Sequence, residues 1–147
     1  MASIADQIDR YFIELEWPFE RFDETLWHTA FPGDMQVHDV FVSADETEWL
    51  SLRSPVCKAP PAERRGELFE HLLRLNSLIP MTKFCLVESG DVYAMVDVPT
   101  HDLSFSEFRT AVMSLVNHVD AYDNEIFKIC EDAAHGSSLV GQGAAAK

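Results

Sequence analysis

Two short strands joined by a tight turn and followed by one long helix dominate the second half of this 147-residue sequence. The strands are expected at residues 81–87 and 92–98, and Gly90 between them supplies the positive φ that a hairpin turn needs. The helix is expected to begin at Ser104, whose side chain can accept a hydrogen bond from the amide of Glu107 while Glu107 reaches back to Ser104. These features predict a hairpin with a helix that packs against it.

The apolar side chains of this long helix recur at alternating spacings of four and three residues, which places them along one face. They are Phe108, Val112, Leu115, Val119, Tyr122, Ile126 and Ile129. Such a face is long enough to cover a sheet or to pair with another helix.

The first half of the chain predicts a helix followed by a meander. Apolar residues from Ile4 to Leu15 recur at helical spacing and end before Trp17-Pro18. Three strands are then expected at residues 19–31, 35–43 and 47–56, with a turn at Pro32-Gly33. A second helix follows, with Pro60-Pro61 in its first turn and Pro80 at its end.

The expected order is therefore α-β-β-β-α-β-β-α. A five-stranded antiparallel sheet packed by helices is a two-layer α+β sandwich. With 47% hydrophobic residues, the chain can bury one core and is too short for two ordinary domains. We expect one domain at residues 1–131 and a disordered tail at residues 132–147, because that tail is rich in Gly, Ser and Ala and lacks apolar periodicity.

The charge and the termini restrict the partners. Eleven basic against 25 acidic residues give a formal net charge of −14, which repels phosphate backbones and anionic lipid heads. Nucleic acid and membrane partners are therefore disfavoured, although the acidity also serves solubility alone. Residues 1–10 carry Asp6 and Asp9 where a secretory signal has basic residues, and no apolar stretch approaches the ~20 residues of a membrane span. We expect a cytoplasmic protein.

The sequence contains no recognisable catalytic or metal-binding motif. It has no GxSxG, P-loop or GxGxxG segment, so we expect no enzyme activity, no catalytic residues and no cofactor. His28 and His38 are placed on adjacent expected strands where they can meet, but no HxxxH or CxxC pair accompanies them, and we expect no metal site. The three cysteines form no CxxC pair and no even framework, which favours reduced thiols over disulfides.

Three segments carry a resemblance to a known family. Residues 73–84 (LRLNSLIPMTKF), 90–99 (GDVYAMVDVP) and 102–104 (DLS) resemble the YbjN family of small bacterial proteins. That family shares the architecture of class I type III secretion chaperones and is described as a regulator of sensory transduction or stress, with no established catalytic residues. The resemblance extends over residues 3–130 in element order. It implies a chaperone-like fold for this chain, and the similar chaperones are acidic homodimers that hold an extended partner segment.

Aromatic residues concentrate in the first third of the chain and suggest a binding surface. Large aromatic side chains supply contact area at small entropic cost, and we take Phe12, Trp27, Phe41 and Trp49 as candidate partner-binding residues. The competing interpretation is that these side chains form an ordinary core. Our first hypothesis is a homodimeric, non-enzymatic adaptor or chaperone-like regulator that binds a protein segment. The alternatives are a small-molecule or stress sensor with a pocket between sheet and helix, and an enzyme with an unrecognised site.

Overall fold

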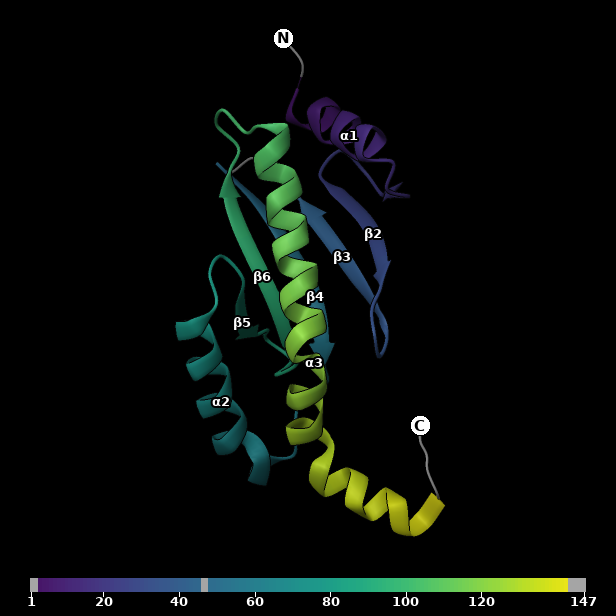
Figure 1. Cartoon of the computed structure of the whole chain (residues 1–147), viewed down its shortest axis with the longest axis vertical. Helices are drawn as coiled ribbons and strands as arrows, with labels where there is room; N and C mark the ends of the chain where they lie inside the picture. The colour runs from purple at the N-terminus through teal and green to yellow at the C-terminus, as the bar shows by residue number, and fades with distance from the viewer. Residues whose placement is uncertain (1–2, 46–47, 143–147) are drawn as a thin grey trace.

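A computed structural model of the chain describes residues 3–45 and 48–142, with side chains described as far as residue 131. The described residues form three α-helices, one short 3-10 helix and six strands (Figure 1). In chain order these are α1 (Ile4–Leu15), β1 (Glu20–Arg21), β2 (Leu26–Pro32), β3 (Val37–Ser43), β4 (Trp49–Cys57), η1 (Ala62–Arg64), α2 (Arg65–Leu78), β5 (Lys83–Leu86), β6 (Val92–Pro99) and α3 (Phe105–Gln142).

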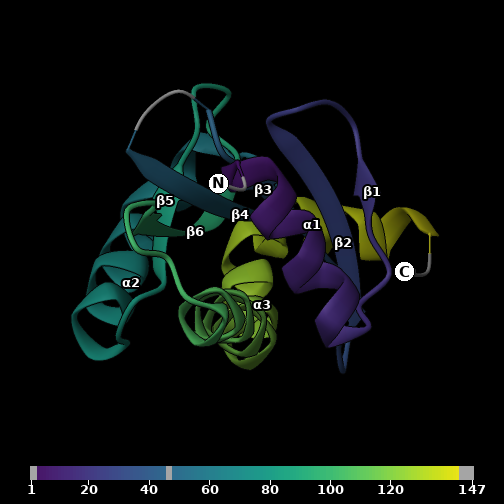
Figure 2. The same cartoon turned by 90° about the horizontal axis from the view of Figure 1, so that it is seen from above.

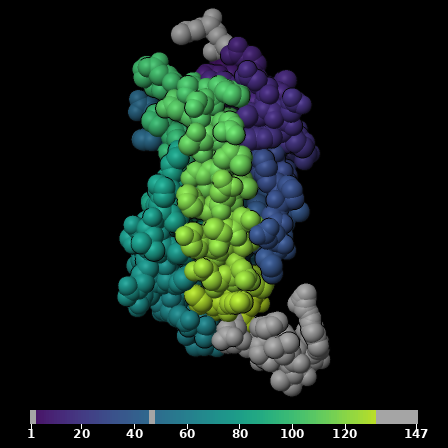
Figure 3. Space-filling model, viewed as in Figure 1, coloured from purple at the N-terminus to yellow at the C-terminus, as the bar shows by residue number. Residues whose placement is uncertain are grey.

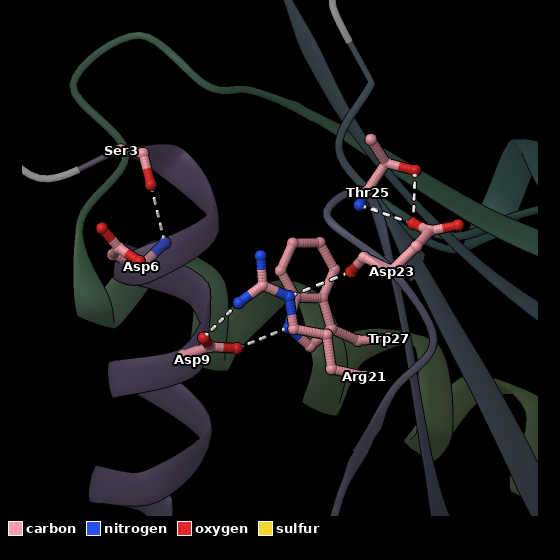
Figure 4. Close-up of polar contacts among 7 residues, drawn as sticks. All are labelled: Ser3, Asp6, Asp9, Arg21, Asp23, Thr25 and Trp27. Carbon is pink, nitrogen blue, oxygen red and sulfur yellow. Dashed lines mark hydrogen bonds and ion pairs between the residues drawn. The ribbon is translucent and has the colours of Figure 1, made fainter.

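The strands form one antiparallel sheet with the order β1-β2-β3-β4-β6-β5. The expected two-layer α+β architecture is confirmed. The sheet has one strand more than the five expected, because residues 19–31 do not form a single strand. Asp23 Oδ1 accepts hydrogen bonds from the amide of Thr25 at 2.7 Å and from its hydroxyl at 2.8 Å, and this local turn separates β1 from β2 (Figure 4).

The helices form the second layer. α3 runs along the middle of the sheet in Figure 1. α1 lies near the beginning of α3, and α2 lies beside the lower half of α3. Seen from above, α2 and α3 lie on the same side of the sheet (Figure 2). The helices cover much of this side in the space-filling view, and the blue β2–β3 region stays visible beside α3 (Figure 3). The core lies between the two layers and includes Ile8, Val40, Leu52, Val96 and Leu115, all buried.

α1 is fastened to the sheet by a buried aromatic residue. Trp27 is fully buried, and its indole Nε1 donates a hydrogen bond of 2.8 Å to Asp9 Oδ1 (Figure 4). The other oxygen of Asp9 pairs at 2.7 Å with Arg21, whose guanidinium lies 5.4 Å from the centre of the Trp27 ring. Phe12 of α1 packs edge-on against Phe108 of α3 at 5.3 Å between ring centres, so α1 contacts both layers.

The local signals of the second half are confirmed. Ser104 accepts a hydrogen bond from the Glu107 amide at 3.0 Å, and Glu107 accepts one from the Ser104 amide at 2.9 Å, as the capping box predicts. Gly90 has a φ of 91° in the turn of the hairpin. The start of the second helix differs from the expectation, because Pro61 precedes the short helix η1 and α2 begins only at Arg65.

The expectation of three reduced thiols is wrong. Cys57 at the end of β4 and Cys130 of α3 form a disulfide, and Cys85 is the free cysteine of the described residues. The two bonded cysteines are 73 residues apart in the chain, so only the packing of α3 on β4 brings them together. α3 continues through residues 132–142 of the expected tail, whereas residues 143–147 lie outside the described part of the chain. The division into a domain at residues 1–131 and a tail stays a prediction.

Candidate partner-binding surface

The second face of the sheet carries no helix among the described residues. Side chains alternate along each strand, so every second residue points away from α3. In β3, for example, His38, Val40 and Val42 are buried, whereas Asp39 and Phe41 are partly exposed. We call the side that points away from α3 the outer face.

One row of the outer face crosses all six strands. The strand register places Glu20 opposite His28, His28 opposite Phe41, and Phe41 opposite Arg53. It continues from Arg53 to Met95 and from Met95 to Lys83. Directly opposite residues on one face of a sheet are in side-chain contact range. These six residues, which we call the outer row, therefore form a band of mixed aromatic, apolar and charged character: Glu20, His28, Phe41, Arg53, Met95 and Lys83.

Further apolar side chains flank the outer row. On one side Tyr93 lies opposite both Pro55 and Cys85, and on the other side Trp49 lies opposite Pro99 at the end of β4. Trp49 is 49% exposed. The outer face thus offers apolar area next to the charged residues of the outer row.

The part of the outer row at β1, β2 and β3 is an aromatic stack. The ring of His28 lies 4.9 Å from the ring of Phe41 and 6.3 Å from the ring of Phe22, measured between centres. The carboxylate of Asp39 holds His28 Nε2 at 2.9 Å. These contacts fix the orientation of the imidazole. Phe41 therefore lies in a preformed aromatic surface on the outer face.

Cys85 lies on the outer face, and its surroundings do not favour the reactive thiolate form. Burial raises the pKa of the Cys85 thiol, while the nearby Arg53 acts to lower it. A thiol with a raised pKa is mostly protonated at neutral pH and reacts slowly. The outer face therefore has the composition of a contact surface, and Cys85 serves as a small apolar member of it.

Two open hollows mark the ends of this face. One, of about 280 Å³, is lined by residues that include Asp39, Pro55, Lys58 and Tyr93. The other, of about 350 Å³, is lined by Asp45, Trp49, Ser51 and Asp97. Each combines apolar side chains with carboxylates, which suits a polypeptide with both apolar and polar groups.

The structure separates the four aromatic residues that the sequence suggested as partner contacts. Phe12 and Trp27 are both 0% exposed and belong to the core, so they offer no surface to a partner. Phe41 lies in the outer row and Trp49 near the end of the outer face. Within the part of the chain that the structure describes, only this second pair is accessible.

Sequence reasoning missed the other members of the outer face. Arg53, Tyr93 and Met95 alternate with buried residues of β4 and β6, and this period-2 pattern is visible in the sequence. The pattern does not say which of the two faces the helices cover. His28 and His38 do not meet, because Phe41 lies opposite His28 and Phe31 lies opposite His38, with the two imidazoles on opposite faces of the sheet.

A second exposed apolar region lies at α2 and the edge strand β5. Leu73 is 69% exposed and Leu78 is 75% exposed, although both belong to a helix that packs on the core. Met81 and Leu86 are also exposed near the same end of the sheet. β5 is the last strand of the sheet order, so one side of its backbone has no neighbouring strand. We call these four residues the α2–β5 edge.

Among the described residues, no helix has the length and apolar character that crossing a bilayer requires.

Comparisons with known proteins agree with this architecture. The sequence profile of the YbjN family, described as "Putative bacterial sensory transduction regulator", matches residues 5–128. No curated protein matches the chain. Among solved structures, the fold is similar to that of YbjN from E. coli, described as "a putative transcription regulator", with a TM-score of 0.58 and 12% identity over 89% of this chain and 92% of that one.

Two further similar structures come from type III secretion. The Yersinia pestis chaperone SycH, solved in complex with a stable fragment of YscM2, has a TM-score of 0.55 and 16% identity, over 80% of this chain and 97% of that one. A chain of the heterodimeric ExoU–SpcU complex of Pseudomonas aeruginosa has a TM-score of 0.59 and 10% identity, over 85% of this chain and 98% of that one. At such identities the likeness concerns the fold. The profile match spans most of the sequence and nearly all of the sheet and helices described above, and on this basis the chain belongs to the YbjN family.

Proposed function

We propose that this protein is a non-enzymatic, chaperone-like interaction module that binds a segment of another protein on the outer face of its sheet. The observation that carries the proposal is the uncovered outer face itself, with its row of paired residues from His28 to Lys83. A sheet face that mixes aromatic, apolar and charged side chains is typical of a protein contact.

The character of the outer face supports a polypeptide partner. Phe41 and Met95 supply apolar contact area, while Arg53 supplies donors for the carbonyl and carboxylate oxygens of a bound segment. The ammonium of Lys83 is used within the chain, because it donates hydrogen bonds to the Asn76 and Ile79 carbonyls at the end of α2. A phosphate backbone would meet the formal net charge of −14 and find few cations to hold it. A protein segment therefore fits this surface better than nucleic acid does.

The similar structures support the same reading. Two of them are described as complexes, one of the chaperone SycH with a fragment of YscM2 and one as the heterodimeric ExoU–SpcU complex. A fold that holds partner segments in those proteins is compatible with the same use here. The regulatory role that the family description names would then act through a bound protein.

One group of hydroxyl and imidazole side chains joins the strand layer to α3. Thr82, Ser114 and His118 contact one another, with 3.0 Å between the two hydroxyls and 3.1 and 3.2 Å to His118 Nδ1. The Thr82 side chain is fully buried, and these contacts satisfy the three groups mutually. The arrangement ties Thr82, directly before β5, to Ser114 and His118 of α3, both of which are partly exposed.

The sensor alternative needs an enclosed pocket between the sheet and a helix. The hollow between the end of the β2–β3 hairpin and α3 has about 240 Å³ and is lined by Met35, Gln36, Asp123, Asn124 and Phe127. Sites for small organic ligands typically have about 300–1,000 Å³. This hollow is smaller than that range, and the one between α2 and the β5–β6 turn, of about 330 Å³, is at its lower end. We therefore favour the protein-binding function.

Pull-down of partners with matched surface variants tests the proposal. We expect Phe41→Ala and Trp49→Ala to keep the circular dichroism spectrum of the wild type and to lose capture of partners from extracts of the native host. Ile13→Ala is the matched control, because Ile13 is an exposed apolar residue of α1, away from the outer face. A partner identified in this way is then titrated as a purified segment against the four proteins.

Two results contradict the proposal. Equal capture and equal affinity for Phe41→Ala, Trp49→Ala and wild type exclude the outer face as the binding site. Tight, salt-sensitive binding of DNA or RNA by the wild type excludes a protein segment as the main ligand.

We also propose that two copies associate through the α2–β5 edge. Exposed Leu73 and Leu78 beside the last strand of the sheet form the kind of apolar surface that isologous dimers bury, while Asn76 already pairs with the backbone of Phe84 on the outer edge of that strand. Light scattering should give about twice the monomer mass of 16.6 kDa. Leu78→Glu should return the mass to that of the monomer, whereas Ile13→Glu should not. A wild type that stays at 16.6 kDa at high concentration contradicts this proposal.

A further inference from the structure

A compact group of three potential metal ligands lies on the inner side of the sheet, opposite the outer face. His38 of β3 faces Asp120 and Asp123 of α3, and one ligand atom from each residue lies within 4.8 Å of the others. His38 Nε2 is 2.9 Å from Asp120 Oδ1 and 3.8 Å from Asp123 Oδ2. The group joins the strand to the helix across the interface of the two layers.

Two of the three side chains are withdrawn from water. His38 and Asp123 are each 1% exposed, whereas Asp120 is partly exposed. A buried carboxylate requires a compensating positive charge or a full set of hydrogen bonds. Asp123 Oδ2 accepts one hydrogen bond from Gln36 Nε2 at 3.1 Å, but its other oxygen, Oδ1, is buried without a hydrogen-bond partner in the described structure.

The charges of the group do not balance with a proton alone. A protonated His38 supplies one positive charge against the two carboxylates of Asp120 and Asp123, and its Nε2–H is directed to Asp120. This leaves the deeper carboxylate, Asp123, with an unpaired oxygen. A divalent cation with a neutral imidazole would balance both carboxylates.

We propose that His38 Nε2, Asp120 and Asp123 bind one divalent first-row cation of the zinc type. One imidazole nitrogen with two carboxylates is a donor set for zinc, cobalt or manganese, whereas calcium and magnesium prefer oxygen donors alone.

The separations of the donor atoms fit a shared ion. Zinc lies about 2.0–2.2 Å from nitrogen and carboxylate oxygen, so two of its ligand atoms at a tetrahedral angle lie ~3.4 Å apart. The His38 separations of 2.9 and 3.8 Å lie on either side of this value. All three ligand atoms lie within 4.8 Å of one another, so the carboxylates must rotate inward to close the site.

The surrounding loop supports the group and leaves a route to it. The amide of Asp34 donates a hydrogen bond of 2.9 Å to Asp120 Oδ1, and a Cβ at Gly33 would collide with His38 Nε2 and Asp120 Oδ1. The loop can approach the ligands this closely only because residue 33 is glycine. The open hollow lined by Met35, Asp123 and Phe127 reaches Asp123 from solvent.

The ion would cross-link β3 to α3. Its affinity should be lower than that of a closed four-ligand zinc site, because the protein supplies three ligands and His38 Nδ1 has no described hydrogen-bond partner to orient the ring. Loss of such an orienting partner typically weakens metal binding by about 10–100-fold.

Metal titration of the chelator-treated full chain tests the proposal. Zn²⁺ is added in a calorimeter, and Co²⁺ is added as an optical probe whose visible absorption reports nitrogen and oxygen ligands. We expect one ion per chain and an increase in melting temperature with Zn²⁺. Asp123→Asn and His38→Gln should each weaken binding at least ~10-fold and abolish the increase in melting temperature.

The other His–Asp pair of the sheet supplies a matched control. His28 Nε2 is also 2.9 Å from a carboxylate, that of Asp39, but the second carboxylate near His28, Glu20, lies at the opposite ring nitrogen. The two carboxylates cannot share one ion with His28, so Asp39→Asn should bind Zn²⁺ like the wild type. Circular dichroism in the presence of a chelator checks that each variant folds, and Asp123→Asn should fold well because it removes a buried charge while keeping an oxygen for Gln36.

Three results overturn the proposal. These are the absence of saturable binding of one Zn²⁺ ion per wild-type chain, unchanged affinity in Asp123→Asn, and loss of binding in Asp39→Asn as large as that in Asp123→Asn. The first result leaves His38 as a plain hydrogen-bond donor to Asp120, and the third assigns the ion to the outer face.

Discussion

Trp27 of β2 donates its indole hydrogen bond to Asp9 of α1 across 2.8 Å, inside the contact between the first helix and the sheet. Both residues come from the segment in which the aromatic side chains concentrate. This contact allows Trp27 to lie in the core, since its polar atom needs a hydrogen-bond partner and finds the partly exposed Asp9 on α1.

Removal of that partner should destabilise the protein. Asp9→Ala leaves the Trp27 Nε1–H buried without an acceptor, and we expect a loss of about 1–3 kcal/mol in the free energy of unfolding. Asp9→Asn retains an oxygen for Trp27 and should cost less. Urea denaturation of the three proteins measures the difference, and equal losses for both variants would show that the ion pair with Arg21 matters instead.

The beginning of α3 provides a second test of stability. Ser104→Ala removes the acceptor for the Glu107 amide, and we expect a cost of ~1 kcal/mol. Ser106→Ala is the control, because Ser106 is an exposed residue of the first turn. Chemical denaturation should shift the midpoint for the first variant only. An unchanged midpoint for Ser104→Ala means that the cap does not contribute.

Two phenylalanines should respond differently to truncation. Phe12→Ala removes a fully buried ring and should cost about 3–5 kcal/mol, which threatens the fold of a protein of ordinary stability. Phe41 is partly exposed on the outer face, so Phe41→Ala should cost less and leave the fold intact. Thermal unfolding followed by circular dichroism separates the two, and similar losses in both variants would place Phe41 in the core.

The stability below pH 4 should depend on Asp120. The hydrogen bond from His38, and next the one from the Asp34 amide, lower the pKa of the Asp120 carboxyl from its ordinary value of 3.8. A lowered pKa in the folded state contributes stability that is complete above 3.8 and is lost as the pH falls through the folded pKa.

Asp120→Asn should remove this contribution. With a chelator present, its unfolding free energy should lie below that of the wild type at pH 6, and the two values should converge as the pH falls below about 3.8. Urea unfolding across this pH range checks the convergence. A constant difference at all pH values would show that the ionisation of Asp120 is not coupled to folding.

The cysteine pairing makes a chemical prediction. Peptide mapping without reductant should find Cys57 linked to Cys130, with Cys85 alkylated slowly because burial raises its pKa. Reduction should lower stability by about 2–4 kcal/mol, since the bond closes a loop of 73 residues. Rapid alkylation of three thiols in the native protein would contradict the disulfide.

Several local features could be predicted from the sequence alone. Gly90 and the pair Ser104 and Glu107 act through residues within four positions of one another, so their spacing in the chain determines their geometry. The order of helices and strands follows from periods of 3.6 and 2, with one exception. At Asp23 a side chain turns the backbone, and the expected strand becomes β1 and β2.

The candidate surfaces depend on contacts that no local pattern contains. Alternation along β3 shows that Phe41 and Val42 point to opposite sides of the sheet, but only the packing of α3 decides that Val42 is buried and Phe41 is accessible. The outer row exists because the register aligns residues of six strands. Sequence by itself therefore determined the elements and their two-sided character, whereas the tertiary structure decided which side faces solvent.

The ion pair and the disulfide also depend on the tertiary structure and not on a local sequence pattern. His38 and Asp120 are 82 residues apart, and Cys57 and Cys130 are 73 apart, so nothing in their spacing predicts that they meet. Each pair is brought together where α3 crosses the sheet. The sequence determined that the chain has a long apolar helix to place there, and the closure of that helix on the sheet, driven by burial of both apolar faces, decided which distant polar groups meet.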